Sequence, residues 1–186
     1  MTNKSWQLQY LNATAAQQIN HQPYSTQFDD VYFNDQGGIA ETSYVFIEHN
    51  RLLQRWQQSA NQSCFCITET GFGTGLNLLT TLQAWHAANT KPQKLHFISC
   101  EKYPLTYQDM ELAHGCFPEL QPFSQQLLTI WQGFNDVFRS GFHTFQLSND
   151  VTFTFALGDA TENLAQLNAS VDAWFLDGFA PKKNPD

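Results

Sequence analysis

The apolar positions of this chain fall into a regular alternation of strand-like and helix-like segments after residue 60. Short continuous apolar runs, which are typical of buried strands, lie between segments whose apolar residues have helical spacing. The predicted strands are CFCIT (64–68), LHFISCE (95–101) and VDAWFLD (171–177). The predicted helices cover residues 74–88, 104–114 (with Pro104 in the first turn) and 160–167.

Two further strands form a predicted hairpin at residues 143–157, where the alternating runs HTFQL and VTFTFAL flank the turn-forming SND. Strands that alternate with helices are typical of an α/β protein with a mostly parallel, doubly wound sheet. A sheet of this kind normally continues, whereas the sequence stops at NPD shortly after a predicted strand. We therefore expect the natural domain to have further C-terminal strands.

The segment before this regular part has a different pattern. Residues 1–45 are polar and aromatic, and short runs such as WQLQYL and VYFN indicate strands or hairpins. Residues 43–60 have apolar positions near helical spacing, which predicts one helix. Its buried side is expected to carry Val45, Phe46, Leu52, Leu53 and Trp56. We expect residues 1–45 to be a β-rich extension packed on the core, and residues 46–186 to be the main domain.

Composition indicates a cytoplasmic globular protein. Of the 186 residues 42% are hydrophobic, which is enough to bury the core of one large domain. No apolar run has the length of a membrane span, and the N-terminus MTNKSWQLQY lacks the apolar stretch of a signal peptide. The four cysteines and six histidines lack the paired spacing of metal ligands, so we predict reduced thiols and no metal site.

Acidic residues follow four of the predicted strands. They are Glu69, Glu101, Asp159 and Asp177. In a doubly wound sheet, ligands bind at the carboxyl ends of the strands, near the switch in strand order. A single acidic strand end is usually a helix cap or part of a solvated loop. Four of them at one edge predict a ligand site.

A glycine-rich loop, ETGFGTGLN at 69–77, connects the first predicted strand to the next helix. Its glycines are Gly71, Gly73 and Gly75. A dinucleotide-binding loop has the pattern G-x-G-x-x-G, but Leu76 stands at the third glycine position. The carboxylate of Glu69 would repel a pyrophosphate and attract an ammonium group. S-adenosylmethionine, which has an ammonium, a carboxylate and a sulfonium, therefore fits this loop better than NAD.

The other three acidic residues suit the rest of a nucleoside cofactor and an acceptor. Glu101 can accept hydrogen bonds from both ribose hydroxyls, a role that dinucleotide enzymes share. Asp159 either accepts from the adenine amino group or caps the helix at 160, and both interpretations stay open. Asp177 opens the block DGFAPKKNPD and either forms a turn or faces the transferred methyl group. For an amine acceptor, this carboxylate would orient the free base.

Four stretches of the chain resemble the methyltransferase domain of the bacterial bifunctional tRNA 5-methylaminomethyl-2-thiouridine biosynthesis proteins. They are DVYFNDQGGIAETSYVFIEHNRLLQRW, ETGFGTGLN, LHFISCEKYPLTYQDMELAH and VDAWFLDGFAPKKNPD, of which the last is the most specific. The resemblance implies a Rossmann-like class I fold that depends on S-adenosylmethionine. It also implies methylation of the aminomethyl nitrogen on carbon 5 of the tRNA wobble 2-thiouridine, the last step of that modification.

The resemblance also implies roles for individual residues. The methionyl end of the cofactor would contact Glu69, Gly71, Gly73 and Gly75, while Glu101 would bind the ribose and Asp159 the adenine. Asp177 would be the catalytic residue that faces the acceptor, with Phe179 and Pro181 in the same substrate-binding block. Thr70 stands where a larger apolar residue is expected. The family usually joins this domain to an FAD-dependent oxidase that prepares the aminomethyl substrate, and nothing in this sequence resembles that module.

The net charge of −8 is a poor match for nucleic acid. We therefore expect most contacts with tRNA phosphates to come from the oxidase domain or from further C-terminal strands. Other interpretations stay open: a methyltransferase of a small-molecule amine, an NAD-dependent oxidoreductase, or a non-catalytic module that binds the cofactor. The acidic charge favours the first of these, whereas Leu76 and Glu69 argue against the second.

Overall fold

The computed structural model describes residues 24–25, 30–33, 37–134 and 139–177. Its centre is a five-stranded sheet in the order β5-β6-β4-β3-β7. The strands are β3 (Phe65–Thr70), β4 (Leu95–Glu101), β5 (Gly141–Ser148), β6 (Val151–Leu157) and β7 (Ala173–Leu176). All pairings are parallel except that of β5 with β6. The predicted mostly parallel α/β sheet and its hairpin are confirmed.

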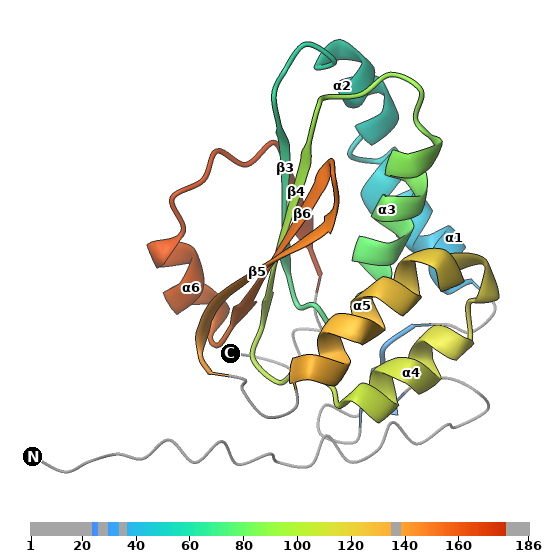
Figure 1. The fold of residues 1–186 in the computed structure, drawn as a ribbon, viewed down its shortest axis with the longest axis vertical. Coiled ribbons are helices and arrows are strands. Elements are labelled where there is room, and N and C mark those ends of the chain that lie inside the picture. Colours follow the sequence, from blue (N-terminus) through green and yellow to red (C-terminus); the bar gives the residue numbers. More distant parts are fainter. Residues whose placement is uncertain (1–23, 26–29, 34–36, 135–138, 178–186) are drawn as a thin grey trace, which may run out of the picture.

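Helices cover both faces of this sheet (Figure 1). One face carries α1 (Gly38–Thr42), α2 (Leu52–Gln58), α3 (Leu76–Ala87), α4 (Tyr107–Gly115) and α5 (Gln121–Phe134). The other face carries α6 (Ala160–Gln166). Shorter elements are the π-helix η1 (Ser43–Glu48), the 3-10 helix η2 (Pro118–Leu120) and the antiparallel strands β1 (Tyr24–Ser25) and β2 (Asp30–Val31).

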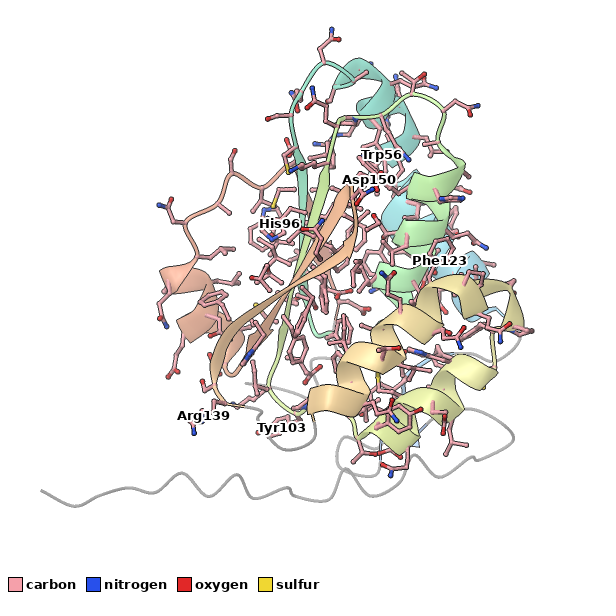
Figure 2. The ribbon with its side chains drawn as sticks, viewed as in Figure 1. Trp56, His96, Tyr103, Phe123, Arg139 and Asp150 are labelled. Atoms are coloured by element: carbon pink, nitrogen blue, oxygen red, sulfur yellow. The ribbon has the colours of Figure 1, made fainter. Side chains whose placement is uncertain are left out.

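The core lies between the sheet and the larger helical layer. Strands β3, β4 and β6 are buried almost throughout, which explains why they read as continuous apolar runs. Trp56, labelled in Figure 2, is fully buried and lies edge-on to Trp85 of α3, with 5.0 Å between ring centroids. The largest fully buried side chains each stabilise the fold by roughly 1.5–3 kcal/mol through removal of apolar surface from water.

The single helix predicted over residues 43–60 is wrong. The π-helix η1 and the helix α2 replace it, and Arg51 between them has a left-handed backbone with φ of 52°. Both the wider π turn and the break at Arg51 change the phase of the apolar positions. Val45 and Leu53 are consequently 43% and 50% exposed instead of buried.

Two other helices differ from the sequence prediction. Helix α4 begins after Thr106, whose hydroxyl caps the backbone N–H of Asp109, so Pro104 precedes the helix rather than forming its first turn. Helix α5 is absent from the predicted elements. Its buried positions, Ser124, Leu127 and Trp131, have helical spacing, but most neighbours are exposed polar residues.

The boundary at residue 45 stays a prediction. WQLQYL lies outside the described residues, whereas VYFN overlaps β2 by one residue. Phe33 is buried in the same core as α3 and lies 4.7 Å from the ring of Phe117. The described part of the segment before residue 46 is therefore continuous with the core of the main domain.

Candidate cofactor and acceptor site

Strand order places the candidate site at the carboxyl ends of β3 and β7. From β3, the chain proceeds outward through β4 and β6 on one side, whereas β7 lies on the other side. This reversal of direction is the switch point at which open α/β sheets bind ligands. The glycine-rich loop follows β3 directly and leads into α3. Glu69 and Asp177 therefore border the switch point, whereas Glu101 and Asp159 follow the more distant strands β4 and β6 at the same edge of the sheet.

The three loop glycines all have positive φ angles, of 85° at Gly71, 53° at Gly73 and 75° at Gly75. Side chains with a Cβ rarely adopt this conformation. A Cβ at Gly75 would also lie 2.7 Å from Cζ of Phe72. The glycines thus let the backbone turn sharply and approach its surroundings closely, as the sequence predicts.

Phe72, which is part of the glycine-rich loop, anchors the loop in the core. Its buried ring stacks on Trp131 at 5.2 Å and on Phe153 at 5.3 Å between centroids. On the same side, Nε2 of the buried His114 lies 2.8 Å from the carbonyl oxygen of Thr74. Burial lowers the pKa of His114, so a neutral imidazole donates this hydrogen bond. The loop is therefore anchored against α4, α5 and β6.

Glu69 is fully buried inside β3. One carboxyl oxygen accepts from Nδ2 of Asn77 at 2.7 Å, and the other accepts from Oγ of Ser99 at 2.5 Å. Burial raises the pKa of Glu69 from its ordinary value of 4.5 to about 8; the two hydrogen bonds act against this shift, and the charges of Asp177 and Glu101 add to it. At neutral pH this carboxyl group is therefore mostly protonated.

Glu101 ends β4 and points back to the glycine-rich loop. Its Oε2 accepts from the backbone N–H of Gly73 at 2.9 Å, and its Oε1 accepts from the backbone N–H of Tyr103 at 2.7 Å. Tyr103 is seen at this end of the sheet in Figure 2. A carboxylate has about four lone-pair positions. Glu101 can therefore accept from two further donors, such as a pair of ribose hydroxyls.

Asp159 caps α6. Its Oδ1 accepts from the backbone N–H groups of Thr161 at 3.0 Å and Glu162 at 3.3 Å, and its Oδ2 lies 3.4 Å from Nζ of Lys102. The helix N–H groups and Lys102 lower its pKa. The capping interpretation therefore describes these contacts, whereas contact with an adenine stays a prediction.

Asp177 follows β7 and has an exposed side chain. Its backbone carbonyl accepts from the hydroxyl of Thr70 at 3.0 Å, and its Oδ2 accepts from Nδ2 of Asn77 at 2.7 Å. Because Asn77 donates to the carboxyl groups of both residues, Asp177 lies next to Glu69 at the switch point. Phe179 and Pro181 lie outside the described residues.

Three contacts of this site are not predicted by the sequence: those of Asn77, Ser99 and Thr70. Asn77 and Ser99 are buried polar residues within apolar segments, and that contrast is the signal that the sequence offers. The free lone pairs of Glu101 fit the hydroxyl groups of a ribose. Glu69 is fully buried and both of its oxygens accept from protein groups, so its contact with the cationic amino-acid end of a cofactor stays a prediction.

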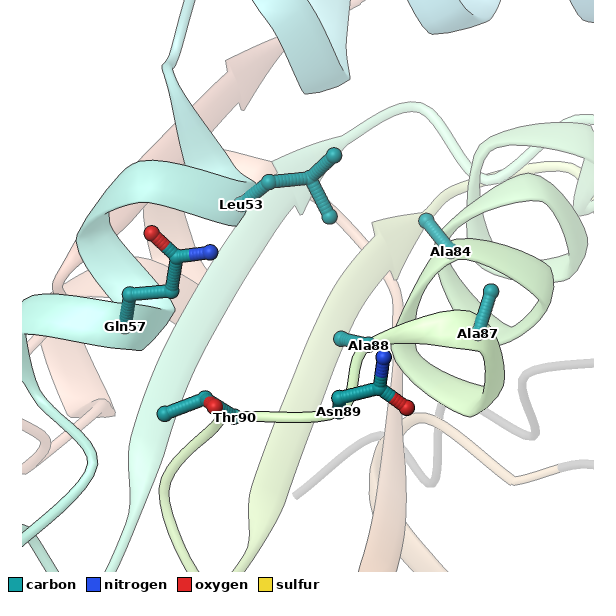
Figure 3. A pocket seen from close by; sticks show the side chains of 7 residues that line it. All are labelled: Leu53, Gln57, Ala84, Ala87, Ala88, Asn89 and Thr90. Carbon is teal, nitrogen blue, oxygen red and sulfur yellow. The ribbon is translucent and has the colours of Figure 1, made fainter.

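A separate pocket of about 300 Å³ lies between α2 and the end of α3 (Figure 3). It is lined by Leu53, Gln57, Ala84, Ala87, Ala88, Asn89 and Thr90. These residues precede β3 and β4, so the pocket lies at the amino ends of the strands, opposite the switch point. Within the described ranges, no cluster of side chains could hold a metal ion, and no helix is long and apolar enough to cross a membrane.

The chain is similar to curated bacterial proteins and to solved structures. It is 49% identical to the tRNA 5-methylaminomethyl-2-thiouridine biosynthesis bifunctional protein MnmC of Chromobacterium violaceum, over 89% of this chain and 24% of the relative. The identity to the protein of the same name from Pseudomonas fluorescens strain Pf0-1 is 46%, over 88% and 24%. The chain thus spans about a quarter of the length of these relatives.

Among the similar solved structures is that of MNMC2 from Aquifex aeolicus, with a TM-score of 0.61 and 24% identity over 87% of this chain and 47% of that one. It supports the Rossmann-like fold. Residues 118–186 match a family described as S-adenosyl-L-methionine-dependent methyltransferase. The chain is thus similar to S-adenosyl-L-methionine-dependent methyltransferases in residues 118–186, and to the MnmC proteins over most of its length.

Proposed function

We propose that this chain methylates the primary aminomethyl nitrogen on the wobble 2-thiouridine of tRNA, giving 5-methylaminomethyl-2-thiouridine. The observation that carries the proposal is the pair of carboxyl groups, Glu69 and Asp177, on either side of Asn77 at the switch point. One is buried beside the glycine-rich loop and the other is exposed. The similar proteins named for biosynthesis of this nucleoside support the choice of acceptor.

The residues of the chain divide into a cofactor part and an acceptor part. Glu69 and the glycine-rich loop would lie at the amino-acid end of S-adenosylmethionine, and Glu101 would hold its ribose. The bound cofactor supplies an activated methyl group on a sulfonium. The contacts of Phe72 and His114 anchor the loop, which limits the conformational freedom that binding has to remove.

Asp177 acts on the acceptor. A primary amine at neutral pH is mostly an ammonium ion, and its nitrogen must lose a proton to water before its lone pair is available. The exposed carboxylate attracts the ammonium form and then accepts a hydrogen bond from an N–H group of the free base, which fixes the direction of the lone pair. Asn77 and Thr70 hold Asp177 in place for this role.

The negative net charge of the chain affects which part of the protein can bind the tRNA phosphates. A protein with a net charge of −8 is poorly suited to neutralise many phosphates by itself. We propose that most phosphate contacts come from other parts of the longer protein, including an FAD-dependent oxidase domain that prepares the aminomethyl group. The same charge favours a small-molecule amine as the alternative acceptor.

Mass spectrometry of tRNA nucleosides tests the acceptor directly. The full-length protein is incubated with S-adenosylmethionine and tRNA that carries the 5-aminomethyl nucleoside, and a mass increase of one methyl group on that nucleoside is expected. Binding of S-adenosylhomocysteine without any such product would favour the small-molecule alternative. A thermal shift with NAD but none with S-adenosylhomocysteine would contradict the methyltransferase assignment.

A further inference from the structure

Asn77 stands where the cofactor part and the acceptor part of the site meet. It is the second residue of α3, its side chain is 6% exposed, and its carbonyl accepts from the hydroxyl of Thr81 at 2.7 Å. The helix and the loop before it therefore fix its backbone. Its side chain points to the carboxyl ends of β3 and β7 through the two hydrogen bonds of Nδ2.

These hydrogen bonds use both protons of one amide nitrogen. Nδ2 lies 2.7 Å from Oε1 of Glu69 and 2.7 Å from Oδ2 of Asp177. Both partners are carboxyl oxygens, so the nitrogen rather than the oxygen of the amide must face them. A serine would offer one proton and an aspartate would offer none. Two donors on a short neutral side chain are a property of asparagine.

We propose that Asn77 is a positioning residue that holds the carboxyl groups of Glu69 and Asp177 at a fixed separation and so couples the cofactor site to the acceptor site. The inference rests on the proposed function for the roles of the two acids. The bridge fixes the exposed carboxyl of Asp177 against the rigid α3. Its two N–H groups also offset the repulsion between these acidic groups when both are ionised.

The bridge has an electrostatic consequence that a purely structural residue would not have. Acidic and thiol groups around Glu69 come from two other segments: Asp177 after β7, and Cys100 and Glu101 on β4. The charges of Asp177 and Glu101 disfavour the ionised form of Glu69, whereas the hydrogen bonds from Asn77 and Ser99 favour it. Loss of the Asn77 amide therefore raises the pKa of Glu69 further and moves its titration to higher pH.

The test compares Asn77→Ser with Trp85→Phe in the full-length protein. Trp85 lies on the same helix and donates from Nε1 to Asp150 at 2.9 Å, at the amino end of the sheet, so its variant also loses a hydrogen bond from a buried side chain. Methyl transfer to aminomethyl-containing tRNA gives kcat and KM. Urea unfolding between pH 5 and 9 gives the pH range over which Glu69 titrates, without reference to activity.

For Asn77→Ser we expect kcat to fall about 10- to 100-fold, the range for a lost hydrogen bond to a charged group, with little change in the KM for tRNA. The pH range of stability loss should move upward, whereas Trp85→Phe should lower stability equally at every pH. If kcat and the pH range of Asn77→Ser match the wild type, the bridge has no function. If the wild type methylates no tRNA, the proposed function is wrong and with it the role of Asn77, whatever the unfolding curves show.

Discussion

The buried carboxyl group of Glu69 should make the stability of this protein depend on pH in a way that one substitution removes. Folding raises its pKa from 4.5 to about 8. A raised pKa means that the native state is fully stabilised below about pH 4.5, and that this stabilisation is lost as the pH rises toward 8. Between these values the native state holds a proton that the unfolded chain lacks. Each pH unit therefore lowers the free energy of unfolding by about 1.4 kcal/mol.

The substitution Glu69→Gln keeps the shape of the protonated acid and cannot ionise. Its amide oxygen can accept from Asn77, and its amide nitrogen can donate to Oγ of Ser99, in place of the bonds that Glu69 makes now. At pH 5 the variant and the wild type should differ in stability by less than about 1 kcal/mol. At pH 7 the variant should be more stable by on the order of 3 kcal/mol, because Glu69 is fully buried and solvent does not screen the cost of its charge.

Urea unfolding at pH 5, 6, 7 and 8 and constant ionic strength measures this difference, with free energies from linear extrapolation. The exposed Glu48, on η1, provides the matched control: Glu48→Gln should follow the wild type within about 0.5 kcal/mol at every pH. Two parallel curves for wild type and Glu69→Gln would refute the reasoning. That result would mean that Glu69 is ionised in the folded protein at pH 5.

Three further predictions concern the loop and the site. Gly75→Ala should lower the free energy of unfolding by about 2–4 kcal/mol, since it adds a Cβ at positive φ and 2.7 Å from Phe72. The control Gly115→Ala, in α4, should be neutral or slightly stabilising. Equal urea midpoints for the two variants would contradict this prediction. Glu101→Ala should weaken S-adenosylhomocysteine binding by about 1.5–3 kcal/mol in calorimetry, and an unchanged Kd would remove Glu101 from the cofactor site. Asp177→Asn should keep that affinity but lose most methyl transfer, so turnover at the wild-type rate would end its proposed catalytic role.

Much of the fold follows from local patterns. The apolar runs predict the strands β3, β4 and β6 within a few residues, because a strand covered on both faces must be apolar along its length. Parallel strands then place their carboxyl ends at one edge, so strand direction alone is enough to group the acidic strand ends. The positive φ angles of the loop glycines agree with the predicted close turn.

Other features depend on contacts that no local pattern records. The break at Arg51 has neither a glycine nor a proline to mark it. Helix α5 is hidden by the polar residues on its exposed side, and its importance for the site lies in the contact of Trp131 with the loop phenylalanine. Asp159 suits a cap or a ligand equally well in the sequence; its contacts with the N–H groups of α6 establish the cap, and contact with an adenine stays a prediction.

Strand direction and alternation, which are local properties of the chain, are enough to bring the acidic residues to one edge of the sheet. The protonation state of these residues, in contrast, does not follow from local properties of the chain. The pKa of Glu69 depends on its complete burial and on hydrogen bonds from Asn77 and Ser99, which are 8 and 30 positions away in the chain. The link from Asn77 to Asp177 spans 100 positions. Desolvation and hydrogen bonding are properties of neighbours in space, and only folding brings these groups together.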